Sequence, residues 1–132
     1  MIHTVTIETP KFSFIKRKDN GSIDYISPFP CPFNYGSVPG TLSGDGDRED
    51  AVVLGKRLKM GVTLEVPVVA VVRFVDKGED DPKYICSYYK ITNSEKMIVV
   101  GFFKFYAFAK GLLNKLRGKK GKTKFAGIDF LT

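Results

Sequence analysis

Carboxylates are concentrated at a few points of a chain that is otherwise basic, with a formal net charge of +7. They form three groups, each next to an apolar strand pattern: Glu8; Asp45, Asp47 and Asp50; and Asp76 and Asp81. Neighbouring like charges raise one another's pKa and oppose ionisation, and a divalent cation removes that penalty. Because hard oxygen ligands suit Mg²⁺ or Mn²⁺ best, the acids indicate a metal site if the fold brings them together.

Two other interpretations of the acids follow from the residue types. Each group could be a solvated turn, because Asp and Gly are ordinary turn residues. A calcium loop beginning at Asp45 is excluded, because such a loop needs Gly at its sixth position and Glu at its twelfth. Here those positions are Asp50 and Lys56. The single histidine, His3, argues against histidine-based catalysis and against a His-rich zinc site.

The composition predicts one core-forming domain over residues 1–132, since 43% of the residues are hydrophobic and 13% are aromatic. No run of about 18 uninterrupted apolar residues is present, so no membrane span is expected. The first residues lack the basic start and apolar centre of an export signal, so we expect a cytoplasmic protein. Cys31 and Cys86 are expected to remain reduced as small buried hydrophobes.

Strand patterns dominate the first two thirds of the chain. Asn20-Gly21 is a strong hairpin signal, whereas the proline-rich stretch 27–40 is predicted to be a loop. The predicted strands are Val5–Ile7, Phe12–Lys18, Ile23–Ile26, Ala51–Leu54, Leu64–Val75 and Lys83–Tyr89.

The apolar period becomes helical after Ser94, with apolar residues at Ile98, Phe102, Phe105 and further on to Leu116. Asn93 or Ser94 is a candidate N-cap, and Gly118 a candidate stop. The basic segment 117–124 that follows is expected to be exposed and flexible. Strands first and a helix last predict a mainly β (α+β) fold, a small, mostly antiparallel barrel with a C-terminal helix packed on it.

The order of these residues resembles soluble family I inorganic pyrophosphatase, from about Ile7 to Tyr106. The Asp-Gly-Asp-x-x-Asp core is specific, and so are the Pro-x-Asn-Tyr-Gly segment before it and the Asp-x4-Asp-x-Lys spacing after it. The residues that carry the resemblance are Glu8, Lys16, Asn34-Tyr35-Gly36, Asp45, Asp47, Asp50, Asp76, Asp81, Lys83 and Phe102-Phe103-x-x-Tyr106. The resemblance implies a five-stranded OB-like barrel, a cytoplasmic homo-oligomer, commonly a hexamer, and hydrolysis of pyrophosphate by a metal-activated water.

The resemblance also implies a role for each site residue. Asp47 matches the carboxylate that accepts the proton of the attacking water. Lys16, Lys83 and Tyr106 match groups that hold phosphate oxygens, and Tyr35 matches a tyrosine that lines the same site. The matches to metal ligands are Asp45, Asp50, Asp76, Asp81 and, as an outer carboxylate, Glu8. Mg²⁺ is the implied cofactor, with Mn²⁺ or Zn²⁺ as alternatives.

The chain departs from the family pattern on the phosphate-binding side. Lys18 stands where the family has Glu, Ala107 where it has Lys, and Cys31 where it has Tyr. The expected arginine has no clear counterpart near Ile23 or Tyr25. The cations that could replace the lost charge are Arg17, Lys18, Arg48 and Lys110.

Other functions remain open at this point. The residues also suit a divergent homologue that acts on or binds another phosphate compound. The net charge, the basic segment 117–124 and the many aromatic residues suit a nucleic-acid-binding OB-like module, although clustered acids repel phosphates unless metal is bound. Lys16 could equally be an ordinary strand lysine, and Tyr106 a core residue.

Overall fold

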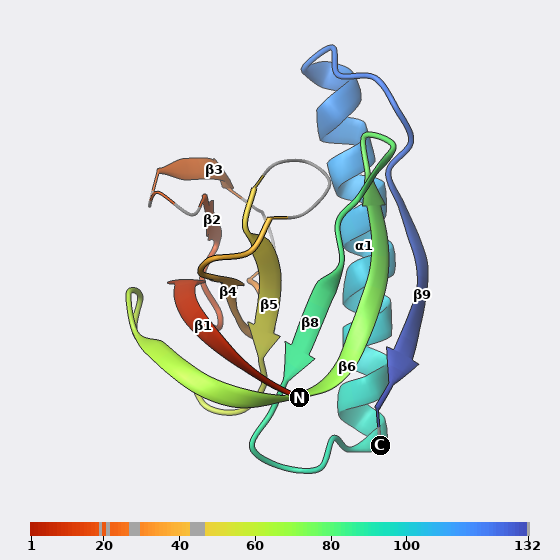
Figure 1. Ribbon diagram of the computed structural model, residues 1–132. Coiled ribbons are helices and arrows are strands. Elements are labelled where there is room, and N and C mark those ends of the chain that lie inside the picture. The colour runs from red at the N-terminus through yellow and green to blue at the C-terminus, as the bar shows by residue number, and fades with distance from the viewer. Residues whose placement is uncertain (19, 21, 27–29, 43–46, 132) are drawn as a thin grey trace.

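The computed structural model describes residues 1–18, 20, 22–26, 30–42 and 47–131 (Figure 1). Strands and one helix make up this part of the chain, and the predicted hairpin turn at Asn20-Gly21 lies partly outside it. The elements are β1 (Ile2–Thr9), β2 (Ile15–Arg17), β3 (Ile23–Ile26), β4 (Asn34–Val38), β5 (Glu49–Val53), β6 (Thr63–Asp76), β7 (Glu79–Asp80), β8 (Lys83–Cys86), α1 (Asn93–Leu116) and β9 (Lys124–Phe130).

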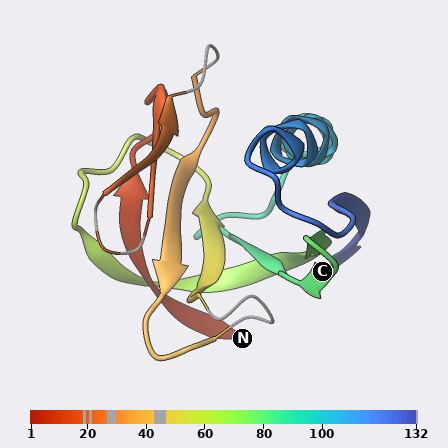
Figure 2. The same cartoon turned by 90° about the horizontal axis from the view of Figure 1, so that it is seen from above.

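Five strands are paired in a closed ring. Strand β1 pairs with β4 on one side and with β6 on the other, both antiparallel. The ring continues through the antiparallel pair β4–β5, the parallel pair β5–β8 and the antiparallel pair β8–β6. Closure leaves these five strands without open edges between them. Figure 2 shows the ring beside α1, which is seen nearly end-on. The prediction of a mainly β fold with a five-stranded ring and a packed helix is confirmed.

The apolar side chains form two cores on the two faces of the ring. All five ring strands contribute to the first, which contains Val5, Ile7, Val38, Ala51, Val53, Val66, Val68 and Cys86. The second joins strand residues such as Tyr35, Val52 and Phe74 to Val99 and Phe103 of α1. Side chains of a strand alternate between faces, so Tyr35 and Val52 point toward the helix while Ala51 and Val53 fill the ring.

Helix α1 is held to the sheet by its buried face. Thr92 is the N-cap, in place of the predicted Asn93 or Ser94, because its side chain accepts from the Glu95 amide and Glu95 reaches back to the Thr92 amide. By length and composition alone α1 could span a membrane. A core helix passes the same test, and Val99, Phe103 and Tyr106 pack it against the strands.

The loop predicted at 27–40 is wrong for residues 34–38, which form β4. Asn34 to Val38 contains no proline, and its strand runs between β1 and β5. Glycine is required at Gly36, because a Cβ there would collide with the Thr6 carbonyl oxygen of β1. Residues 27–29 lie outside the described part of the chain.

The prediction that the helix is the last element is wrong. Strand β9 follows it and pairs antiparallel with β6, along the flank of α1 (Figure 1). The pairing register shifts between Arg73 and Phe74, opposite Gly127, whose φ is +126°. This irregularity interrupts the alternation by which a strand is recognised in sequence. Lys119, Lys120 and Lys122 of the basic segment are exposed, and its flexibility stays a prediction.

Candidate active site

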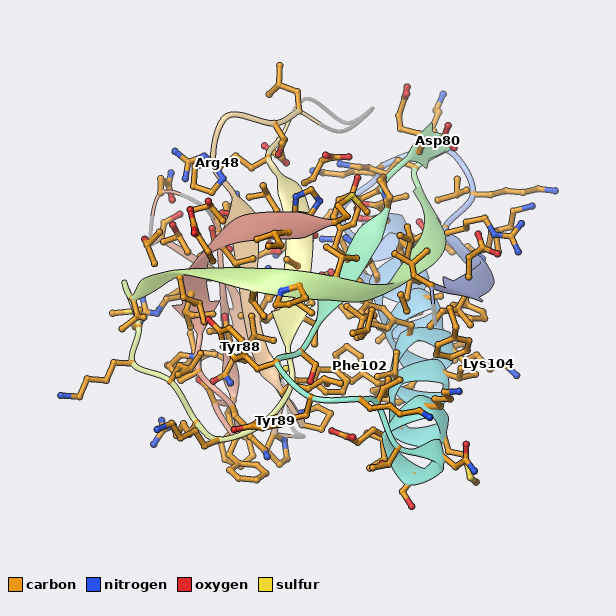
Figure 3. The ribbon with its side chains drawn as sticks, turned by 60° about the horizontal axis from the view of Figure 1, so that its bottom comes forward. Arg48, Asp80, Tyr88, Tyr89, Phe102 and Lys104 are labelled. Carbon is orange, nitrogen blue, oxygen red and sulfur yellow. The ribbon has the colours of Figure 1, made fainter. Side chains whose placement is uncertain are left out.

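The predicted acids that the structure describes meet at one end of the ring, where β5 begins, β6 ends and β8 begins (Figure 1). Figure 3 shows Arg48 and Asp80, which neighbour the acids in sequence, toward that end, with Tyr88 and Tyr89 toward the opposite end. A cavity of about 260 Å³ lies among these acids. We call it the acidic cavity; its lining includes Glu8, Asp47, Asp50, Asp76 and Asp81. Asp45 lies outside the described residues.

Lys83 stands between two of the predicted metal ligands. Its Nζ lies 2.5 Å from Oδ2 of Asp50 and 2.7 Å from Oδ2 of Asp81. The parallel pairing of β5 with β8 sets Asp50 opposite Lys83, which places both side chains on one face. Asp81 precedes Lys83 by two residues and shares that face. The lysine is buried, so the two carboxylates compensate a charge that water does not reach.

Asp50 is fixed further by Tyr35, whose hydroxyl donates to Oδ2 of Asp50 at 3.1 Å. Burial raises the pKa of Asp50, but the charges of Lys83 and Lys16 and the hydrogen bonds from Lys83 and Tyr35 outweigh burial, so the pKa lies below its usual value. Burial lowers the pKa of Lys83, but Asp50 and Asp81 outweigh it and raise that pKa above its usual value. The pair is therefore ionised at neutral pH.

Glu8 is aimed at the cavity by an irregularity in β1. Ile7 is opposite Gly36 and Thr9 is opposite Tyr35, so Glu8 is the extra residue between them. Its Oε2 accepts a hydrogen bond of 2.7 Å from the hydroxyl of Ser37 on β4. The Glu8 carboxylate is thus buried with a defined orientation.

Asp76 is anchored by two residues that the sequence patterns did not single out. Its Oδ1 accepts from Nδ2 of Asn114 at 2.8 Å and from Oγ1 of Thr123 at 3.0 Å. Asn114 lies on α1 and Thr123 just before β9, so both late elements help to hold this carboxylate. A sequence signal exists for Asn114 alone: it falls eight residues after Tyr106, on the helix face that packs on the sheet.

Asn34, Tyr35 and Gly36 serve different parts of this architecture. The fully buried Asn34 accepts from the amides of Lys11 and Leu58, at 3.0 and 2.8 Å. Its amide group donates to the carbonyls of Val53 and Lys56. Asn34 therefore ties the segment after β1 and the segment after β5 to the start of β4. Tyr35 reaches Asp50, and Gly36 lets β1 approach.

Cations also line the acidic cavity. Lys16 and all four residues considered as replacements for the lost charge, Arg17, Lys18, Arg48 and Lys110, border it. The Nζ of Lys16 lies 4.7 Å from the centroid of the Tyr35 ring, within the range of a cation–π contact. The cavity therefore combines carboxylates, which suit a metal ion, with cations, which suit a polyphosphate.

An ion-pair cluster that sequence reasoning missed ties the β2–β3 ribbon to α1. Asp24 of β3 lies 3.6 Å from Nζ of Lys110 and 3.3 Å from Nη1 of Arg117. Burial raises the pKa of Asp24, but Lys110, Lys16 and Arg117 outweigh burial and hold the pKa below its usual value. This cluster positions Lys110 and Arg117 at the cavity rim.

The acids fit a hard divalent cation by chemistry. In the described part of the chain, no group of three or more His, Cys, Asp and Glu side chains is arranged to hold a metal ion. Lys83 lies between Asp50 and Asp81 instead. Nevertheless, six carboxylates line this cavity, and those other than Asp24, which pairs with Lys110 and Arg117, offer an all-oxygen donor set of the kind that Mg²⁺ and Mn²⁺ prefer.

Tyr106 has both of the positions weighed for it from sequence. It packs in the core between α1 and the sheet, where its ring lies 6.5 Å from that of Tyr35. It also lines the acidic cavity. The structure thus brings together every described residue among the predicted site residues, while their individual roles remain predictions.

Comparison with known proteins identifies the family of this chain. A family model for inorganic pyrophosphatase matches residues 5–112. This chain belongs to the inorganic pyrophosphatase family. The inorganic pyrophosphatase of Haemophilus influenzae is 43% identical over 67 residues, which cover 48% of this chain and 38% of that protein. The match thus spans well under half of that relative's length.

Solved structures of the pyrophosphatase family share the fold. The inorganic pyrophosphatase from Neisseria gonorrhoeae superimposes with a TM-score of 0.73 and 29% identity, covering 98% of this chain and 82% of that chain. The enzyme from Thermus thermophilus gives 0.76 and 27%, with the same coverage of both chains. The likeness therefore extends through β9, beyond the end of the family-model match.

Proposed function

We propose that this member of the pyrophosphatase family hydrolyses inorganic pyrophosphate to two phosphates in a metal-dependent reaction. The observation that carries the proposal is one cavity whose lining combines the carboxylates of Glu8, Asp47, Asp50, Asp76 and Asp81 with several lysines and arginines. Hydrolysis of this dense polyanion requires neutralised charge, an activated water and a fixed geometry.

The proposed metal ligands are the described acids Glu8, Asp50, Asp76 and Asp81, together with Asp45. Mg²⁺ is the proposed ion, with Mn²⁺ or Zn²⁺ as alternatives. A bound divalent cation would neutralise pyrophosphate oxygens and lower the pKa of a water molecule. The hydrogen bonds from Ser37 to Glu8 and from Asn114 to Asp76 orient these carboxylates in advance.

The chain's own residues supply the remaining functions. Lys83 carries a buried positive charge to the cavity wall, and Lys16 adds a second charge beside Tyr35. Both lysines are proposed to hold phosphate oxygens. Asp47 is exposed at the cavity, where it can accept a proton and pass it to solvent. Tyr35 keeps Asp50 in place, and Tyr106 lines the wall between the helix and the cavity.

Lys110 is the proposed replacement for the cation lost at Ala107. It lies one helical turn after Tyr106 and borders the cavity while paired with Asp24. If this assignment holds, Lys110→Ala should raise the Michaelis constant for pyrophosphate or lower turnover. Unchanged kinetics would show that the contact is dispensable or that Arg17, Lys18 or Arg48 supplies it.

We further propose a cytoplasmic homo-oligomer, a hexamer by the family resemblance. Support comes from a row of exposed apolar side chains along α1, at Met97, Ile98, Phe108, Leu112 and Leu116. Such a row commonly marks a protein–protein interface. Light scattering of the purified chain would measure the oligomer mass, and a monomer at micromolar concentration would contradict the proposal.

The deciding experiment is steady-state phosphate release from pyrophosphate with Mg²⁺, Mn²⁺ or Zn²⁺, with EDTA as the control. Activity with metal and its loss with EDTA would support the proposal. Metal-dependent thermal stabilisation without phosphate release would instead indicate a binding homologue. A salt-sensitive gel shift with oligonucleotides, without phosphate release, would favour the nucleic-acid alternative.

A further inference from the structure

A second hollow adjoins the acidic cavity, and its walls are apolar. It has a volume of about 560 Å³ and lies between the β2–β3 ribbon and α1. This volume is in the range of about 300–1,000 Å³ typical of ligand pockets. We call it the apolar hollow; its walls include Phe14, Ile15, Ile26, Phe102, Phe105 and Leu113.

The two spaces share a border. Lys16, Tyr106 and Lys110 line both the acidic cavity and the apolar hollow, and Tyr35 lines the hollow next to them. Lys16 is among the groups proposed above to hold phosphate oxygens. Lys16 lies over the Tyr35 ring, and the Tyr35 and Tyr106 rings stack, so the border consists of polar tips on aromatic bodies. A ligand phosphate at this border would have charge on one side and apolar surface on the other.

The apolar hollow presents large side chains to solvent. Phe14 is 50% exposed, Ile26 71% and Phe105 49%. Pyrophosphate itself has no apolar part and would leave this surface uncovered. The two spaces are continuous, and the lysines at their border complement an anionic group. They therefore suit a ligand that is anionic at one end and hydrocarbon at the other.

We propose that the acidic cavity and the apolar hollow form one site for an organic diphosphate, the diphosphate monoester of an apolar alcohol. Its diphosphate group lies in the acidic cavity and its hydrocarbon chain in the apolar hollow. This inference rests on the proposed function, since the same metals and lysines hold the diphosphate. In the reaction, water oxygen attacks the terminal phosphorus and the anhydride P–O bond breaks. The bridging oxygen leaves with the alkyl monophosphate, so the products are that monoester, inorganic phosphate and a proton.

The test compares two probes that differ in chain length alone: the geranyl and methyl monoesters of methylenediphosphonate, whose P–C–P bridge resists hydrolysis. Titration calorimetry of the full chain with Mg²⁺ should show the geranyl ester binding at least about tenfold more tightly, because it buries apolar surface. Equal dissociation constants for the two esters in the wild-type protein would overturn the inference.

Two variants locate the effect. Ala109 lines the apolar hollow and does not border the acidic cavity, so Ala109→Phe fills the hollow. It should abolish the geranyl advantage while methyl-ester binding and pyrophosphate hydrolysis stay within about twofold. Ala126→Phe, at an exposed position of β9, is the matched control. Phe14→Ser removes an exposed wall residue and should weaken geranyl binding even if Ala109→Phe does not fold.

The outcomes separate the inference from the proposed function. Pyrophosphate hydrolysis with equal binding of both esters overturns the inference alone. No hydrolysis and no binding of either ester overturns the proposed function. A geranyl advantage that survives both variants also overturns the inference. A lower oligomer mass in Phe14→Ser, with no geranyl advantage in the wild-type protein, would show that a second copy of the chain covers the hollow.

Discussion

Replacing Lys83 by methionine gives a sharp test of the acidic cavity, because this lysine is buried between two carboxylates. Methionine keeps much of the side-chain volume and removes the charge that lies 2.5 Å from Asp50 and 2.7 Å from Asp81. Loss of one partner from a buried ion pair costs about 3–5 kcal/mol, since it leaves buried charge uncompensated. In EDTA at pH 7 we expect this loss in the free energy of unfolding.

The size of the domain converts this loss into a measurable shift. For a chain of this length, 1 kcal/mol lowers the midpoint of thermal unfolding by about 3–4 °C, so Lys83→Met should lower it by about 10–20 °C. Urea unfolding in EDTA would measure the free energy directly. The control is Lys104→Met, because Lys104 is exposed on the outer side of α1, whereas Phe102 lies on the side that faces the strands (Figure 3). It should change stability by no more than about 0.5 kcal/mol.

Mg²⁺ adds a second measurement to the same variant. Without Lys83, a cation can compensate Asp50 and Asp81 without displacing an ammonium group. Mg²⁺ should therefore stabilise Lys83→Met by about 2.7 kcal/mol at a hundredfold excess over the dissociation constant of the variant, and should stabilise the wild-type protein less. At a temperature where the variant is folded, phosphate release should fall about 10- to 100-fold, the value of one charge-assisted contact.

Two results would refute this reasoning. Equal stability of Lys83→Met and the wild-type protein in EDTA would show that the carboxylates do not depend on the lysine. Mg²⁺ that stabilises neither protein would contradict metal binding by Asp50 and Asp81.

Three further predictions address individual carboxylates. Asp50→Asn should abolish phosphate release and weaken Mg²⁺ binding in titration calorimetry, because Asp50 is one of the proposed metal ligands; near-normal hydrolysis would remove it from the metal site. Asp47→Asn should lower turnover by about 10²–10⁴-fold, the usual effect of removing a general base, while Mg²⁺ affinity is kept; equal losses in both would make Asp47 a ligand. Asp24→Asn should cost about 1–2 kcal/mol at pH 7. Because the pKa of Asp24 is held below its ordinary value of 3.8, its charge stabilises the fold above that pH, and the stabilisation is lost as pH falls through the lowered pKa. Urea unfolding at pH 7 and pH 3 should show the penalty shrinking, and an equal penalty at both would exclude charge as its source.

Local patterns in the sequence were sufficient to predict most of the elements. The spacing of Asp47 and Asp50, and of Asp76, Asp81 and Lys83, carries the family resemblance from which a metal and phosphate site is predicted, and the structure places these residues around one cavity. Helix α1 and strand β6 are recognisable from apolar periodicity, since one face of each element packs on a core.

Pairings between distant segments could not be predicted in this way. Asp50 and Lys83 are 33 residues apart and meet because β5 and β8 pair in parallel. The prolines before and after β4 favoured a loop prediction over a strand prediction. Strand β4 can pair with β1 because Gly36 has no side chain at the point where β1 passes closest.

The same limit applies to the residues that hold the site from behind. Asn114 and Thr123 reach Asp76, and Asp24 reaches Lys110, only once α1 and β9 are packed against the ring. Chain sequence fixes which side chains are available and the short-range geometry of each motif. Closure of the five-stranded ring and docking of α1 decide which of them meet, because contacts of long sequence separation depend on the packing of the whole domain and leave no periodic signal in the sequence.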